Sequence, residues 1–124
     1  MNDNPSAQKT NGNAEEARSD VSVKHCFREE TGSGEFVDVL ELAIEETGDR
    51  ATGYYNWLPA RKSQRTGEFR GSIRENIVSA DYEYIQEGTS GTETIEIVLE
   101  ETQAVVRGGP ISLGLNAEVP RINC

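Results

Sequence analysis

The sequence predicts an all-β domain, an antiparallel up-and-down meander of about eight strands that forms a closed or nearly closed small barrel. Three observations lead to this prediction. Short segments in which apolar and polar residues alternate recur along residues 21–124, with the period of two that is typical of half-buried strands. Short turns separate most of these segments, and no stretch of the sequence shows a convincing helical period. A meander removes its open edges by closing into a barrel.

The clearest element is a hairpin over residues 66–84, with the sequence TGEFRGSIRENIVSADYEY. A two-residue turn in its middle places Phe69 opposite Tyr82 and Gly71 opposite Ala80. Both apolar sets then lie on one face of the hairpin, as a half-buried antiparallel pair requires.

The two faces of this hairpin differ in character. The outer face places Arg70 opposite Asp81, a pair of opposite charges that stabilises a hairpin by a few tenths of a kcal/mol. The inward glycines allow the sheet to bend and leave room for Phe69 and Tyr84 to lie across it.

The same alternation predicts the other strands. A turn centred on residues 47–48 places Leu42 opposite Gly53 and Leu40 opposite Tyr55. A second turn places Ile97 opposite Val106, and the segment 111–118 shows no clear pattern. We expect strands at residues 21–28, 36–46, 51–58, 67–74, 77–84, 92–100, 103–107 and 119–124.

The first twenty residues differ from the rest of the chain. They contain no Val, Ile, Leu or aromatic residue, so we expect a disordered linker at residues 1–20 and one barrel domain at residues 21–124. A polar start of this kind typically follows the cleavage site of an exported or lipid-anchored protein, whose location would be periplasmic or at the outer membrane or cell surface. The alternative is a cytoplasmic protein with a flexible end.

Net charge and segment length argue against nucleic-acid binding, anionic-membrane binding and a membrane-spanning helix. The net charge is −10, which argues against binding to a nucleic-acid backbone or an anionic membrane. No segment approaches the length of a transmembrane helix.

The two cysteines, Cys26 and Cys124, bracket the predicted domain. Meander order brings the last strand beside the first, so a disulfide would close nearly the whole domain. Two features disagree with a regular closure. Pro120 has no N–H to donate, and the alternation places Cys26 on the outer face of its strand. We therefore expect an irregular seam with the disulfide at or outside it, the alternative being two free thiols.

Residues 55–88 contain a pattern of four motifs: Tyr55-Asn56, Pro59 with Arg61-Lys62, a Gly-x-φ-x-Gly run at residues 67–71, and a Tyr-x-Tyr-x-x-Glu-Gly run at residues 82–88. By this pattern they resemble a group of small bacterial lipoproteins of unknown function. The resemblance implies export and a lipocalin-like or calycin-like barrel, and it implies no activity. The chain departs from the group in its Trp57-Leu58 pair, and the lipid-bearing cysteine is absent, so an anchor upstream of the chain is inferred only.

Catalytic chemistry finds little support in the sequence. No cluster of His, Cys and Asp has the spacing of metal ligands, and no nucleophile motif such as Gly-x-Ser-x-Gly is present. The single histidine, His25, is expected to be a hydrogen-bonded core residue. We expect no catalytic site, no bound metal and no cofactor.

The predicted function is a non-enzymatic binding module with two candidate sites. One is the barrel wall, which either encloses a small apolar ligand or is simply a filled core; a packed interior would argue against the ligand. The other is a basic patch on the loop at residues 59–65. Six of the twelve basic residues fall at residues 50–74. This loop either recognises an anion or an acidic partner, or is simply solvated. An envelope protein–protein interaction or inhibitor domain acting through outer loops is the alternative function. The wall comprises Leu40, Tyr55, Trp57, Phe69, Tyr82 and Tyr84, and the patch comprises Arg61, Lys62 and Arg65.

Overall fold

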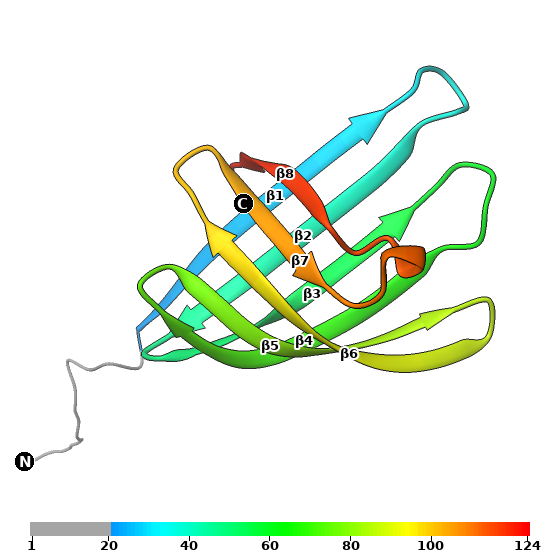
Figure 1. Ribbon diagram of the computed structural model, residues 1–124. Helices are drawn as coiled ribbons and strands as arrows, with labels where there is room; N and C mark the ends of the chain where they lie inside the picture. The colour runs from blue at the N-terminus through cyan, green and yellow to red at the C-terminus, as the bar shows by residue number, and fades with distance from the viewer. Residues whose placement is uncertain (1–20) are drawn as a thin grey trace, which may run out of the picture.

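The computed structural model describes residues 21–124, which form a closed antiparallel barrel of eight strands in meander order (Figure 1). This confirms the predicted fold class. A short 3-10 helix, η1 (Ile111–Leu113), interrupts the connection between the last two strands. Residues 1–20, for which a linker was predicted, lie outside the described residues. The strands are β1 (Ser22–Thr31), β2 (Asp38–Thr47), β3 (Arg50–Leu58), β4 (Arg65–Arg74), β5 (Ile77–Gln86), β6 (Thr89–Leu99), β7 (Gln103–Gly108) and β8 (Ala117–Ile122).

The β4–β5 hairpin has the predicted register. Phe69 pairs with Tyr82 and Gly71 with Ala80, within an unbroken ladder from Arg65↔Gln86 to Arg74↔Ile77. The turn is made by Glu75 and Asn76, both in the left-handed region with φ of 53° and 66°. Two positive φ angles match the right-handed twist of the flanking strands, so this turn tolerates a glutamate at a position that usually favours glycine. The predicted pairing of Ile97 with Val106 between β6 and β7 is also confirmed.

The predicted register between β2 and β3 was wrong by two residues. Leu40 pairs with Trp57 and Leu42 with Tyr55, because the turn is centred one position later than expected. Gly48, with φ of 62°, occupies the first turn position. A slip of two residues keeps every side chain on its own face, so the alternation of apolar and polar residues cannot reveal it.

The centre of the barrel is filled by apolar side chains from all eight strands. Tyr55, Val78, Tyr82, Ile97 and Val106 are each 0% exposed. The packed interior leaves the ends and the outer faces of the barrel as the surfaces where a partner can bind. Other core residues include Phe27, Leu42, Ile44, Phe69, Ile73, Ile95, Leu99, Ala104, Leu115 and Val119.

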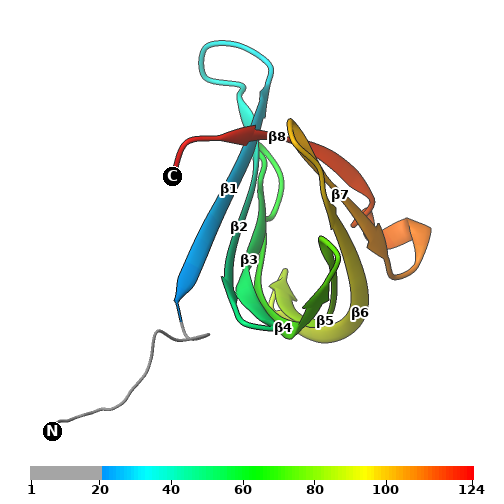
Figure 2. The same cartoon turned by 90° about the vertical axis from the view of Figure 1, so that its left-hand side faces the viewer.

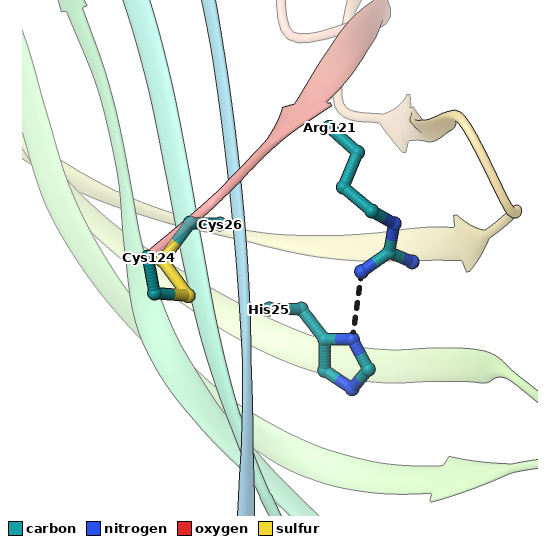
Figure 3. Close-up of a disulfide and its surroundings, with 4 residues drawn as sticks. All are labelled: His25, Cys26, Arg121 and Cys124. Carbon is teal, nitrogen blue, oxygen red and sulfur yellow. Dashed lines mark hydrogen bonds between the residues drawn. A yellow bond between two sulfur atoms is a disulfide. The ribbon is translucent and has the colours of Figure 1, made fainter.

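The barrel closes at a short seam between β1 and β8. Only Cys26↔Ile122 and Phe27↔Arg121 are paired there, and Figure 2 shows β8 crossing β1 rather than running along it. Pairing stops at Pro120, as its missing N–H predicts. A disulfide joins Cys26 to Cys124 beside these pairs, with the two Cα atoms 5.2 Å apart (Figure 3). The predicted disulfide and irregular seam are both confirmed.

The short seam leaves one half of β1 uncovered. Alternation places Val23 and Phe27 on the same face of β1, yet Val23 is 49% exposed while Phe27, beside the seam, is buried. The first half of β1 extends past the end of β8. Among the described residues no helix is long and apolar enough to cross a membrane.

Candidate functional site

One end of the barrel gathers most of the predicted binding residues. The β1–β2, β3–β4, β5–β6 and β7–β8 connections all lie at this end, on the right of Figure 1. Cross-strand pairing places Leu40 beside Trp57, and Trp57 beside Arg65. Part of the predicted barrel wall therefore lies at the same end as the three residues of the predicted basic patch, and we call this end the arginine end.

Arg65 was expected on an exposed loop, and that expectation was wrong. It is the first residue of β4 and is 2% exposed, the only charged side chain in the buried class among residues 21–124. Alternate residues of a strand face the same side of the sheet. Arg65 lies two residues before Gly67 and four before Phe69, so it shares the inward face of the hairpin with them. Extending the alternation by one more position would have placed this side chain inside the barrel.

Arg65 forms a hydrogen-bonded cluster with two tyrosines. Its Nε donates to the hydroxyl of Tyr82 at 3.3 Å, and that hydroxyl donates in turn to the backbone carbonyl of Tyr55. The guanidinium carbon also lies 5.2 Å from the centroid of the Tyr55 ring, close enough for a cation–π contact. We call Tyr55, Arg65 and Tyr82 the tyrosine–arginine cluster.

The cluster occupies a gap in the sheet. The ladder between β3 and β4 is regular up to Tyr54↔Glu68 and resumes only at Trp57↔Arg65. In the gap, Asn56 Oδ1 accepts the backbone N–H of Gly67 at 3.0 Å, while Tyr82 bonds the Tyr55 carbonyl. Side chains thus satisfy backbone groups that the ladder would otherwise pair. The sequence analysis did not identify this role of Asn56.

Glycines make room for the aromatic side chains of the site. A Cβ added at Gly67 would lie 2.8 Å from the Tyr82 ring, and one added at Gly91 would lie 2.7 Å from the Tyr84 ring. The Tyr82 and Tyr84 rings stack with centroids 5.7 Å apart. The expectation that inward glycines let aromatic side chains lie across the sheet is confirmed, although the pairs differ from those expected.

The β7–β8 connection closes the arginine end. The Tyr55 hydroxyl donates to the carbonyl of Leu115 at 2.8 Å, and Arg65 Nη1 donates to the carbonyl of Leu113 at 3.3 Å. Leu115 is buried in the core, whereas no residue of η1 is buried. Sequence reasoning missed this plug, although the two-residue spacing of Ile111, Leu113 and Leu115 after a Gly-Gly-Pro break was a usable signal.

Burial keeps both phenols of the cluster neutral. It raises the pKa of Tyr55 to about 12, and the nearby charge of Arg65 offsets only part of this effect. Burial raises the pKa of Tyr82 as well, against an opposing hydrogen bond from Arg65. At neutral pH the tyrosines therefore serve as hydrogen-bond donors, while the guanidinium carries a full positive charge.

The other basic residues do not form one patch. Arg61 and Lys62 are exposed on the β3–β4 loop at the arginine end, and the Arg61 guanidinium lies 4.0 Å above the Phe36 ring. Arg50 and Arg74 flank turns at the opposite end of the barrel. Arg61 and Lys62 therefore lie at the same end as Arg65, whereas antiparallel strands carry residues 50 and 74 to the other end.

The six predicted wall residues divide by depth. Tyr55, Phe69 and Tyr82 are buried in the core, whereas Leu40, Trp57 and Tyr84 are half-buried. Of the half-buried three, Trp57 pairs with Arg65 and with Leu40, and Tyr84 stacks on Tyr82, which bonds Arg65. Leu113 of η1 also packs against the core. Any ligand site built from these residues is therefore a shallow one at the arginine end.

A second polar cluster lies at the seam. His25 Nε2 is 3.1 Å from Glu46 Oε1, and its Nδ1 is 3.0 Å from Arg121 Nη1 (Figure 3). Arg121 also donates to the carbonyls of Glu100 and Glu101. His25 is hydrogen-bonded, as expected, but it lies half-buried at the seam and not in the core. Within the described part of the chain, no group of three or more His, Cys, Asp or Glu side chains could hold a metal ion.

Comparisons with models of known protein families, with curated proteins and with solved structures give no match to this chain. The resemblance to small exported lipoproteins stays a prediction.

Proposed function

We propose that this protein is a non-enzymatic, exported or lipid-anchored binding module that holds a small apolar ligand at the arginine end of its barrel. The filled centre argues against a ligand deep inside, so the site lies among the half-buried side chains of Leu40, Trp57 and Tyr84 at the same end of the barrel as Arg65. The observation that carries the proposal is Arg65 Nη2, a buried donor with no hydrogen-bond partner among residues 21–124, which an acceptor group on an otherwise apolar ligand would satisfy. Buried polar groups are almost always paired, so this donor marks a place where a partner is missing.

Export is supported by the disulfide at the seam. Such a bond forms and persists in oxidising compartments and is rare in the cytosol. Thiol titration of the native, unreduced protein from its own cell tests this part, and we expect no reactive thiol. Two reactive thiols would contradict both the bond and the export.

Native mass spectrometry of protein purified from its source tests the ligand. We expect a small-molecule adduct that is lost on denaturation. A protein that carries Arg61→Met should keep the adduct, because Arg61 is exposed and stacked on Phe36. A protein that carries no small molecule and co-purifies with a defined protein would contradict the ligand and favour the second function.

That second function is an envelope protein–protein interaction or an inhibitory domain. It is favoured by a groove of about 820 Å³ on the outer face of β3 to β6, which includes Gly67 and Gly91. Tyr54 and Ile85, which are 43% and 57% exposed, line it together with Glu68 and Glu83. An exposed aromatic and an exposed aliphatic side chain beside two carboxylates suit a protein surface of positive charge. Tyr54→Ser should abolish co-purification if this groove is the interface.

A further inference from the structure

The guanidinium of Arg65 is only partly satisfied. Its two hydrogen bonds, to Tyr82 and to the Leu113 carbonyl, are both 3.3 Å long, beyond the usual range for N–H···O bonds. The third nitrogen, Nη2, is buried and has no partner in the part of the chain that the structure describes. The group presents a fork of donors, and the side of the fork that includes Nη2 is unused.

The charge of Arg65 also lacks a counter-ion. Among residues 21–124 the ion pairs join Arg28 to Glu30 and Glu41, His25 contacts Glu46, and none of these contacts includes Arg65. A buried, unpaired charge is strongly unfavourable, and an arginine cannot lose its charge as a lysine can. In a chain with a net charge of −10, the one buried cation is thus kept away from every described carboxylate.

A purely structural role explains these observations less well. If Arg65 served only to hold η1, a neutral amide donor would bond the Leu113 carbonyl without burying a charge. The cation–π contact with Tyr55 offsets part of the unfavourable burial but leaves Nη2 unbonded.

We propose that the ligand carries a carboxylate, which binds Arg65 in the place now held by the Leu113 carbonyl. The inference rests on the proposed function and names the chemical class of its ligand. A carboxylate matches the planar fork of a guanidinium and neutralises its charge. The half-buried side chains of Leu40, Trp57 and Tyr84 nearby suit a hydrocarbon tail. The ligand is therefore a small amphiphile with an anionic head and an apolar tail.

The plug is built to move aside. It is flanked by Gly109 and Gly114, whose φ angles of 69° and 72° lie in the left-handed region. No residue of η1 is buried, and Ile111 is 89% exposed. Lifting η1 breaks the long bond from Arg65 to Leu113 while Leu115, two residues later, stays in the core. Access to the guanidinium therefore requires only a local rearrangement.

Trp57 reports directly on this site. It is the only tryptophan of the chain, is half-buried, and pairs with Arg65 across β3 and β4. The experiment titrates the full-length protein with monomeric decanoate and, separately, with decanol, while tryptophan emission is recorded. Arg65→Met removes the charge and keeps an apolar side chain of similar length, and Arg61→Met is the matched control on the exposed loop.

We expect decanoate to bind saturably and Arg65→Met to weaken it by about tenfold or more, the effect of losing one charge-assisted hydrogen bond. Decanol should bind both proteins equally, and Arg61→Met should behave as the unaltered protein. If decanoate and decanol bind alike, or if Arg65→Met leaves decanoate unchanged, the carboxylate is rejected while the proposed function stands.

If neither probe binds, the inference is rejected, and the adduct in native mass spectrometry decides the proposed function independently. Should Arg65→Met fail to fold, Arg65→Lys keeps the charge but loses the planar fork. We then expect severalfold weaker binding of decanoate alone, and an unchanged affinity for it would overturn the inference.

Discussion

The β4–β5 hairpin and the β1–β8 seam close the same sheet by different means. The hairpin has an unbroken ladder of paired residues from end to end, with a filled inner face. The seam has two paired positions, and its cohesion comes from a disulfide and from the contacts of Arg121. Repeated backbone pairing needs a regular strand on both sides, and Pro120 prevents that in β8. A covalent bond then replaces the missing hydrogen bonds.

The largest effect is expected at the seam. Replacing both cysteines by serine should lower the free energy of unfolding by on the order of 4–5 kcal/mol, because the bond closes a loop of 98 residues in the unfolded chain. Urea denaturation of the variant and of the unaltered protein measures the difference. Reducing agent should destabilise only the unaltered protein. Equal stability of the two proteins would mean that the seam holds without the bond.

A second prediction concerns Tyr55 of β3, whose hydroxyl bonds the Leu115 carbonyl in the β7–β8 connection. The pKa of Tyr55 is raised to about 12 in the folded protein, so its stabilising effect is present below pH 10 and is lost as the pH rises from 10 to 12. A rise of about two units corresponds to roughly 2–3 kcal/mol. Denaturation at several pH values should show this loss, and Tyr55→Phe should flatten the curve above pH 10. A steep loss in the phenylalanine variant would exclude Tyr55 as its source.

The third prediction tests the close packing of the hairpin. Gly67→Ala should destabilise the protein by about 1–3 kcal/mol, because the added Cβ would clash with the backbone carbonyl oxygen of Glu83 and would lie 2.8 Å from the Tyr82 ring. Ser72→Ala on the exposed face of the same strand is the control and should change little. Thermal denaturation compares the two. A mild effect at residue 67 would show that the paired strand and the ring can both shift to admit the methyl group.

The fourth prediction returns to the seam. Arg121→Met should lower stability by about 1–2 kcal/mol, since it removes bonds to the carbonyls of Glu100 and Glu101 and to His25. Arg107→Met, on the exposed face of β7, serves as the matched control. Urea denaturation should separate the two variants, and equal midpoints would leave the disulfide as the sole support of the seam.

The smallest effect is expected on the outer face of the hairpin. Arg70 and Asp81 are paired across the strands as predicted, yet no ion pair within 4.0 Å joins them in the described residues. Arg70→Ala should therefore change stability by less than about 0.5 kcal/mol. A larger loss in denaturation would indicate that the two side chains meet in solution.

The barrel and its seam could be predicted because each left a local signal. Alternation with a short turn set the register of β4 and β5, and the parity of Cys26 with the position of Pro120 indicated an irregular closure. The β2–β3 register could not be predicted, since a slip of two residues leaves the alternation unchanged.

The site was less predictable, because it depends on tertiary contacts. In the β7–β8 connection the spacing of Ile111, Leu113 and Leu115 is the one local signal. Its role comes from the bonds of Leu115 to Tyr55 and of Leu113 to Arg65, which lie far away in the sequence. Arg65 was assigned by its charge, which usually means exposure, although its parity pointed inward. Where charge and parity disagreed, parity was correct, and the disagreement itself marked the candidate site.

The disulfide has a mechanical consequence. If the domain is pulled between Val21 and Cys124, the tension passes from residues 21–25 straight through the sulfur–sulfur bond. All the strands after Cys26 lie on a closed covalent ring that bears no tension along its length. In a single-molecule stretching experiment with handles at these two points, the extension should therefore increase by the length of only a few residues. After reduction the same trace should release the entire barrel, so the thiol state determines how far the chain extends.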